Sequence, residues 1–112
     1  MKENNNPLVS FFTPFHNKGD KLRRTYDSLK KQTYLNWEWV LVNDSSDNGK
    51  SLKVVEDIAN DDCRFKVYDF RIKSGGIVGE SKYRAAMLSN GKYLMELDDD
   101  DYLTEDAAEL MI

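Results

Sequence analysis

The sequence between residues 93 and 103 reads Tyr-Leu-Met-Glu-Leu-Asp-Asp-Asp-Asp-Tyr-Leu. Its first part, Tyr93–Leu97, is a short and mostly apolar run, which is typical of a strand buried on both faces of a parallel sheet. Four consecutive aspartates follow at positions 98–101, and apolar character resumes at Tyr102 and Leu103. The acidic run is therefore held between ordered segments, at the point where a buried strand ends.

The same strand pattern recurs upstream, with helical patterns between the strands. We predict strands at Leu8–Thr13, Trp39–Asn43, Phe65–Phe70 and Tyr93–Leu97. We predict helices at Lys21–Gln32, Ser51–Asn60 and Glu80–Ser89, the last with Tyr83, Ala86 and Met87 on its apolar face, and a final helix with Thr104 as its N-cap. Strands that alternate with helices of this length imply right-handed crossovers. The predicted fold class is therefore α/β, a doubly wound and mostly parallel sheet with Rossmann-like β-α-β-α-β-α-β order.

Length and composition exclude several classes of protein. The chain has 112 residues, 40% of them hydrophobic and 32% charged, which suits one globular domain or part of one. Its net charge is −4 and no basic stripe is present, so we expect no nucleic-acid partner. The single cysteine, Cys63, allows neither an internal disulfide nor a Cys/His zinc site, which favours a cytoplasmic protein. No apolar run approaches the roughly 20 residues of a membrane span. Peripheral association with the membrane surface, through sequence outside these residues, stays open.

In a doubly wound sheet, ligands bind beyond the carboxyl ends of the strands. Three polar segments fall there: Pro14–Gly19, Asp44–Gly49 and Asp98–Asp101. Like-charged carboxylates that lie close together repel one another by several kcal/mol at intermediate dielectric, so a run of four favours a bound cation. Oxygen ligands suit hard divalent ions such as Mg²⁺ or Mn²⁺. A solvated acidic turn is the alternative interpretation.

The other polar positions carry weaker signals. Asp44 follows a buried strand, where a carboxylate can accept a hydrogen bond from a base or a ribose, whereas Asp47 suits turn and helix-cap chemistry. The glycine-rich residues 73–79 match no phosphate-binding loop pattern. His16 is the only histidine, and we expect a loop contact there rather than a catalyst.

Taken in order, these segments resemble the amino-terminal half of family 2 glycosyltransferases, which have the GT-A fold. The stretches that carry the resemblance are Val9–Asn17, Leu29–Tyr34, Trp37-Glu38, Val42–Gly49, Gly91–Tyr93 and Leu97–Asp101. The resemblance implies an enzyme that moves a sugar from a nucleotide diphosphate donor, commonly a UDP-sugar, to an acceptor hydroxyl with inversion at the anomeric carbon. Other hypotheses remain: a nucleotide-sugar-binding or metal-binding module without catalysis, and a receiver-like signalling domain. The last is disfavoured because Thr13-Pro14, and not a group of acids, follows the first strand.

The resemblance also implies roles for individual residues. Asp98-x-Asp100 matches the family's DXD motif, in which the first carboxylate lies by the ribose and the metal and the second coordinates the metal, here Mn²⁺ or Mg²⁺. Asp44 matches the position that accepts from the nucleobase edge. Lys82 stands where many members carry arginine, which leaves a general cationic contact. Thr13, Pro14 and Phe15 match the first nucleotide-contact loop, with the Phe15 ring facing either the base or the loop interior.

The resemblance finally implies a domain organisation and partners. Residues 1–7 are an extended or disordered lead, and residues 8–112 are the donor-binding part of a GT-A domain that stops before its acceptor half. The catalytic base is expected beyond Ile112, so we expect no activity from the 112 residues alone. Expected partners are a nucleotide-sugar donor and a carbohydrate or lipid-linked acceptor. An exposed sheet edge would also favour a homodimer.

Overall fold

Four parallel strands form the sheet in the computed structural model, which describes residues 6–17, 21–70, 78–98 and 103–112. The strands are β1 (Val9–Phe15), β2 (Trp37–Asn43), β3 (Phe65–Asp69) and β4 (Tyr93–Glu96). They lie in the order β3-β2-β1-β4. β1 pairs with β2 from Val9↔Trp37 to Phe15↔Asn43, and with β4 from Val9↔Tyr93 to Phe12↔Glu96. The predicted α/β class and parallel sheet are confirmed.

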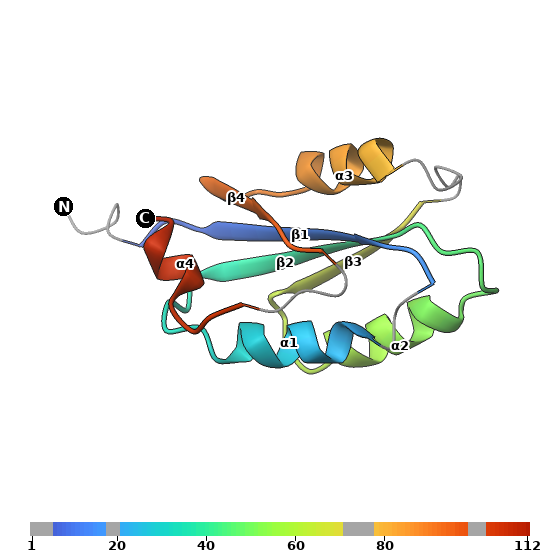
Figure 1. Cartoon of the computed structure of the whole chain (residues 1–112), viewed down its shortest axis with the longest axis horizontal. Coiled ribbons are helices and arrows are strands. Elements are labelled where there is room, and N and C mark those ends of the chain that lie inside the picture. The colour runs from blue at the N-terminus through green and yellow to red at the C-terminus, as the bar shows by residue number, and fades with distance from the viewer. Residues whose placement is uncertain (1–5, 18–20, 71–77, 99–102) are drawn as a thin grey trace.

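Helices cover both faces of this sheet (Figure 1). They are α1 (Leu22–Lys30), α2 (Lys50–Ala59), α3 (Val78–Met87) and the short α4 (Ala107–Leu110). α1 and α2 lie on one face, and α3 lies on the other, against β1 and β2. The sheet is therefore doubly wound, as the alternation of strands and helices predicts.

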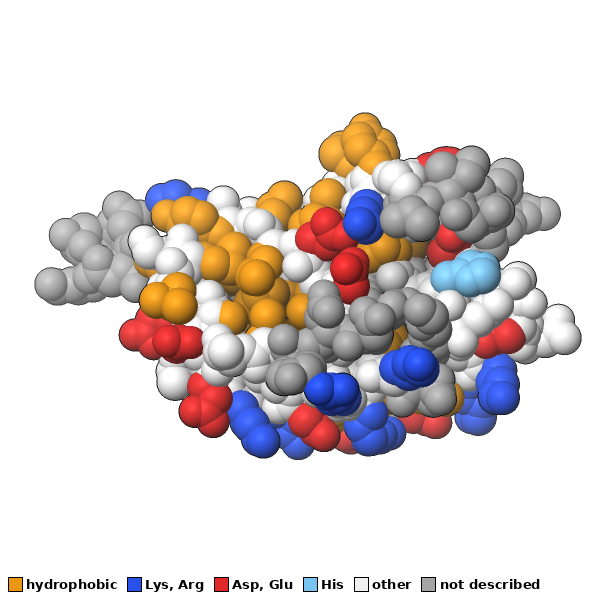
Figure 2. Space-filling view, in the orientation of Figure 1, with side chains coloured by type: hydrophobic (Ala, Val, Ile, Leu, Met, Phe, Trp, Pro, Cys, Tyr) orange, Lys and Arg blue, Asp and Glu red, His pale blue; other side chains and the backbone are white. Residues whose placement is uncertain are grey.

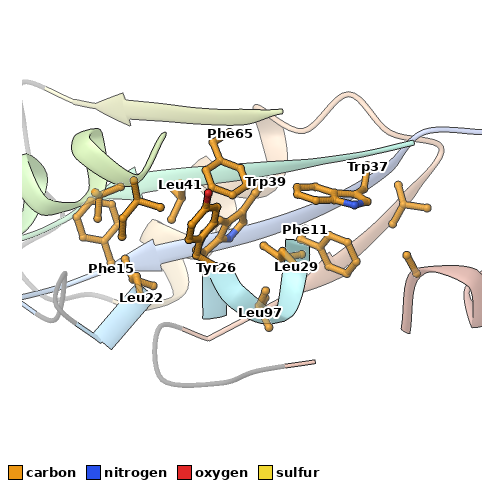
Figure 3. Packing of buried hydrophobic residues seen from close by; sticks show 14 residues of the cluster. Phe11, Phe15, Leu22, Tyr26, Leu29, Trp37, Trp39, Leu41, Phe65 and Leu97 are labelled. Carbon is orange, nitrogen blue, oxygen red and sulfur yellow. The ribbon is translucent and has the colours of Figure 1, made fainter. Parts of the chain in front are cut away.

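The face under α1 and α2 holds an aromatic core (Figure 3). The Phe65 ring lies at its centre, with ring centroids 4.9 Å from Tyr26, 5.1 Å from Trp39 and 5.8 Å from Trp37. Phe11 meets Trp37 edge to face at 6.5 Å. Such pairs stabilise a core beyond the apolar area that they bury. The core fixes the sheet on this side, so the strand ends are held in place for the loops that follow.

On the opposite face, the described side chains of α3 that are buried are small ones. Ser81 and Ala85 are buried there, at 3% and 0% exposure. The predicted apolar face of this helix was wrong, because Tyr83 and Met87 are 66% and 67% exposed. Hydrophobic side chains accordingly stand out on α3 in Figure 2. α3 packs closely on β1 and β2, and the large residues point away from the sheet.

A buried carboxylate anchors the amino-terminal end of the sheet. Glu38 is 1% exposed and accepts hydrogen bonds from the Ser10 hydroxyl at 2.6 Å, the Asn90 amide at 2.7 Å and Lys66 Nζ at 2.8 Å. Burial alone would raise the pKa of Glu38, but the bonds from Lys66, Ser10 and Asn90 together lower it. The Gly91 amide donates to Ser10 Oγ at 2.7 Å. This network joins β1, β2 and β3 to the turn before β4.

One buried side chain just after α1 holds the segment that follows β4 in place. Gln32, 3% exposed, donates to the Thr104 carbonyl at 2.7 Å and accepts from the Ala108 amide at 3.0 Å. The prediction of Thr104 as a helix N-cap was wrong, because α4 begins at Ala107 and its N-cap is Asp106. The Thr104 hydroxyl instead bonds to the Asp106 carboxylate at 3.0 Å, just outside the helix.

Candidate functional site

The loops that follow β1 and β2 are joined into one unit at the carboxyl end of the sheet. The Asn17 amide donates to Ser45 Oγ at 2.9 Å, and the Ser46 amide donates to Asn17 Oδ1 at 2.8 Å. Asn17 adopts a left-handed backbone with φ 57°, which asparagine tolerates better than most residues. The Asp44 amide also bonds to the Phe15 carbonyl at 2.8 Å. Two of the three segments predicted to meet here therefore do so.

Asp44 is a buried carboxylate at the end of β2, with 6% exposure. The Ser81 hydroxyl, from the first half of α3, donates to Asp44 Oδ2 at 2.8 Å. A charged acceptor strengthens such a bond. Sequence reasoning missed Ser81, since a serine inside a helix gives no signal of its own. Its position one residue before Lys82 is the only hint that the sequence offers.

Asp47 has the structural role that its turn setting predicts. Its carboxylate accepts from the Ser51 hydroxyl at 2.7 Å and from the Ser51 amide at 3.2 and 3.3 Å. The Ser51 hydroxyl is the main cause of the lowered pKa of Asp47. Gly49, the N-cap residue of α2, has a left-handed backbone with φ 83°. Asp47 therefore stabilises the start of α2, whereas Asp44 contacts α3 through Ser81.

Asp98 leaves β4 beside Lys82 of α3. Lys82 Nζ forms an ion pair with Glu96, which precedes Asp98 by two residues and so shares its side of the strand. The hydrogen bond to Glu96 raises the pKa of Lys82, and the Asp98 charge adds to this effect. Lys82 is likewise the main cause of the lowered pKa of Glu96. Figure 2 shows acidic and basic side chains in contact where β4 leaves the sheet below α3.

Sequence reasoning did not single out Glu96 as part of the site. The signal that could have found it is the two-residue alternation of a strand, which places positions 96 and 98 on one side. Lys82 and Asp98 were both predicted, and the structure brings them together with Glu96. The outcome is a lysine ammonium paired with the Glu96 carboxylate, with the Asp98 carboxylate nearby, at the carboxyl edge of the sheet.

The residues matched to the first nucleotide-contact loop lie deeper than that match implies. β1 continues through Pro14 to Phe15, so the strand does not end at Thr13. Phe15 has no exposed surface and belongs to the hydrophobic core, which supports loop packing over a ring that faces a base. Thr13 is also fully buried, whereas Pro14 is half-buried. Any direct contact of Thr13 or Phe15 with a ligand would need movement of the strand.

The donor groups at this edge suit a hard divalent cation. Glu96 and Asp98 offer carboxylate oxygens, which Mn²⁺ and Mg²⁺ prefer. Asp100, the second predicted metal ligand, lies outside the described residues, as does most of the glycine-rich stretch 73–79. Within the described parts of the chain, no three His, Cys, Asp or Glu side chains are grouped as a metal site. His16 is exposed and directly follows β1.

Comparison with known proteins identifies this arrangement. The sequence model described as Glycosyl transferase family 2 matches residues 10–112. The chain belongs to glycosyl transferase family 2. The match starts at the second residue of β1 and includes Asp44, Lys82 and the whole acidic run, so the family's pattern covers every element of the site.

Two curated family relatives come from Pasteurella multocida, a chondroitin synthase and a hyaluronan synthase. Each is 31% identical to this chain over 106 residues, which are 95% of this chain but only 11% and 10% of the two synthases. The chain therefore spans about a tenth of the length of these relatives.

Solved structures support the same assignment to the GT-A glycosyltransferases. A fragment of TarS from S. aureus in complex with UDP has a TM-score of 0.77 and 27% identity, over 90% of this chain and 30% of that one. GalNAc-T7 with UDP, GalNAc and Mn²⁺ has a TM-score of 0.73 and 28% identity, over 97% of this chain and 21% of that one. Among the described helices, none is long and apolar enough to cross a membrane.

Proposed function

We propose that this chain is the donor-binding part of a glycosyltransferase that moves a sugar from UDP to an acceptor hydroxyl with inversion. The observation that carries the proposal is the approach of three charged residues around α3. Asp44 reaches α3 through Ser81, and Asp98 lies next to Lys82 on the same helix. All three stand at the carboxyl edge of the sheet, where doubly wound folds bind nucleotides. The UDP complexes of TarS and GalNAc-T7 support this placement.

Asp44 is proposed to recognise the base. Its carboxylate is an acceptor only, so it pairs with the ring N–H of uracil and cannot satisfy an acceptor atom in the same place. Ser81 fixes one carboxylate oxygen at 2.8 Å, which limits the directions from which a base can approach. Half-buried Pro14 stands at the end of β1 and is proposed to border the base from the neighbouring strand.

Asp98, Asp100 and Lys82 are proposed to hold the diphosphate side of the donor. A divalent cation bound by the two aspartates would stabilise the negative charge that gathers on the leaving diphosphate. Asp98 contacts the ribose as well in this proposal. Lys82 supplies a positive charge from α3, and its ion pair with Glu96 keeps that charge next to Asp98. In this proposal the divalent cation and Lys82 allow the acidic run to bind the negatively charged diphosphate instead of repelling it.

The base that deprotonates the acceptor hydroxyl is proposed to lie outside these 112 residues. A carbohydrate or a lipid-linked carbohydrate is the proposed acceptor. The GalNAc-T7 complex with Mn²⁺ supports a divalent metal in this fold, and Mn²⁺ or Mg²⁺ is proposed here. Attachment to the cytoplasmic membrane surface and a homodimer through a sheet edge remain predictions.

Calorimetry of UDP binding tests the proposal. We expect UDP to bind the 112-residue chain at least about tenfold more tightly with Mn²⁺ than with chelator, because one charged contact at the diphosphate is worth about 1.4 kcal/mol or more. Asp98→Asn should remove most of this difference. Asp57→Asn is the matched control, since Asp57 is an exposed aspartate of α2 away from the site.

Two results would contradict the proposal. Equal affinity with metal and with chelator would remove the metal from the site. A loss of affinity in Asp57→Asn as large as that in Asp98→Asn would show that general charge, and not the Asp98 position, holds the nucleotide.

A further inference from the structure

Pro14 interrupts the hydrogen bonds of a strand that has neighbours on both sides. In the pairing of β1 with β4, the Leu97 amide bonds to the Phe12 carbonyl at 3.0 Å. The Phe12↔Glu96 register places Thr13 beside Leu97. In a parallel ladder the Leu97 carbonyl would then accept from the amide of residue 14. That residue is proline and has no N–H, so the carbonyl lacks its regular donor.

The Thr13 hydroxyl takes the place of the missing amide. Thr13 Oγ1 donates to the Leu97 carbonyl oxygen at 2.5 Å, and both residues are buried, at 0% and 2% exposure. A buried carbonyl without a donor would cost free energy comparable to a lost hydrogen bond. The Thr-Pro pair therefore ends the regular β1–β4 ladder while it keeps the last residue of the buried run attached.

Trp39 sets the direction of this hydroxyl. Its indole Nε1 donates to Thr13 Oγ1 at 2.8 Å, and the Trp39 side chain is fully buried in the aromatic core. An indole N–H is a donor only, so the hydroxyl must accept from Trp39 and give its own hydrogen to Leu97. The two hydrogen bonds therefore point in one direction, from Trp39 of β2 to Thr13 of β1 and from Thr13 to Leu97, which directly follows β4.

We propose that Thr13 is a positioning residue for the donor site, which acts through Leu97 on Asp98. With its amide held by Phe12 and its carbonyl held by Thr13, Leu97 fixes the point at which the chain leaves the sheet. Asp98 is the next residue and the first of the acidic run. The proposal rests on the proposed function, and it replaces the direct nucleotide contact that the family resemblance implies for Thr13.

Three variants separate this role from general stability. Thr13→Val keeps the shape of the side chain and removes the hydroxyl, Thr13→Ser keeps the hydroxyl, and Trp39→Phe removes the indole donor. In Thr13→Val we expect UDP affinity with Mn²⁺ to fall by about two- to tenfold, the range of one net hydrogen bond. UDP affinity with chelator should change little, and Thr13→Ser should restore the wild-type values. Trp39→Phe should give an intermediate loss.

Hydrogen exchange provides a readout that needs no nucleotide. The Leu97 amide should exchange faster by a similar two- to tenfold factor in Thr13→Val than in the wild type, because the end of β4 frays. Thr33→Val is the matched control, since it removes another threonine hydroxyl, bonded to Glu109 at 2.7 Å, at the opposite end of the sheet. It should leave Leu97 exchange and UDP affinity unchanged.

The two readouts distinguish this inference from the proposed function. If the wild type shows no metal-dependent UDP binding, the proposed function fails, whereas faster Leu97 exchange in Thr13→Val still supports the hydrogen bond. If the wild type binds UDP with Mn²⁺ but Thr13→Val loses affinity equally with metal and with chelator, Thr13 is only structural and the inference is wrong. Unchanged Leu97 exchange in Thr13→Val would also overturn it.

Discussion

The Ser81 hydroxyl of α3 and the Asp44 carboxylate at the end of β2 form a hydrogen bond in the interior of the protein. The exposed fractions are 3% for Ser81 and 6% for Asp44, and the Ser81 hydroxyl donates to Asp44 Oδ2 at 2.8 Å. This bond links α3 to the end of β2, so the helix and the carboxylate that we propose to recognise the base are positioned together.

Ser81→Ala should weaken the preference of the chain for uracil. The change removes one hydrogen bond to a buried carboxylate, so UDP affinity should fall by about two- to tenfold while the protein stays folded. Competition among the nucleoside diphosphates measures the preference. Ser89→Ala is the control, since the Ser89 hydroxyl, just after the end of α3, donates to the Ala85 carbonyl at 3.0 Å and not to Asp44. Equal losses in both variants would argue against a role for Ser81 in base selection.

Asp44→Ala should change the ranking of the nucleobases. Loss of a charged hydrogen bond to the ring N–H of uracil costs about 1.5 to 3 kcal/mol, and the other bases lose less because they do not offer the same donor. The same competition experiment checks this outcome. If the ranking stays as it is in the wild type, Asp44 belongs to the turn and not to the nucleotide site.

Gly91→Ala should destabilise the fold at the amino-terminal end of the sheet. An added Cβ would lie 2.6 Å from Ser10 Oγ and 2.8 Å from the Leu8 carbonyl oxygen, and the second of these is backbone that cannot rotate away. The expected loss is about 1 to 3 kcal/mol in the free energy of unfolding, measured by urea denaturation. Gly79→Ala is the matched control, because no atom of the described residues lies within 4 Å of its added Cβ and alanine favours the helix. A Gly91→Ala protein as stable as the wild type would contradict the close packing described here.

Glu38→Gln should lower the free energy of unfolding near neutral pH and make that free energy depend less on pH in the acidic range. The pKa of Glu38 is lowered in the folded state from its ordinary value of 4.5, so its contribution is complete above that value and is lost as the pH falls through the folded pKa. At pH 7 we expect the free energy of unfolding of the variant to be about 1 to 2 kcal/mol below that of the wild type, a loss that the partial exposure of Lys66 limits. This difference should shrink below pH 4.5. Urea denaturation at a series of pH values measures it. Glu56→Gln is the control at an exposed position of α2, and its free energy of unfolding should follow that of the wild type at every pH.

The 112 residues alone should bind donor without transferring sugar. General-base assistance contributes about 10² to 10⁴ in rate, and the carboxylates placed at the site are already assigned to base, ribose or metal. The measurement is product formation from a UDP-sugar and a carbohydrate acceptor by the purified chain. Turnover would show that a base lies within these residues, and Asp101 would be the first position to substitute.

The order of strands and helices could be predicted because apolar runs and helical spacing are local properties. The errors arose where packing decides. Pro14 suggests a strand end, yet β1 continues to Phe15 because its pairing with β2 runs on through Pro14↔Val42 to Phe15↔Asn43. On the β4 side, the Thr13 hydroxyl supplies the donor that Pro14 lacks. Tyr83 and Met87 were predicted to form a buried face, yet both are exposed, and among the described side chains of α3 it is Ser81 and Ala85 that are buried.

The charged members of the site could be predicted from their places after strands, as with Asp44 and Asp98. The residues that hold them could not. Ser81, Glu96 and Trp39 act through partners that are distant in the sequence, and no local pattern connects Trp39 with Thr13 across 26 positions. Supporting contacts of this kind become visible only when the strands are placed side by side.

The pairing of Asn17 with Ser45 and Ser46 has a consequence for protein engineering. Because the loops after β1 and β2 share backbone-to-side-chain bonds in both directions, neither is an independent module. A chimera that exchanges only one of them with a relative would leave an amide of the other without its acceptor. Recombination that aims to alter the proposed donor choice therefore requires that the two loops be transplanted as a pair.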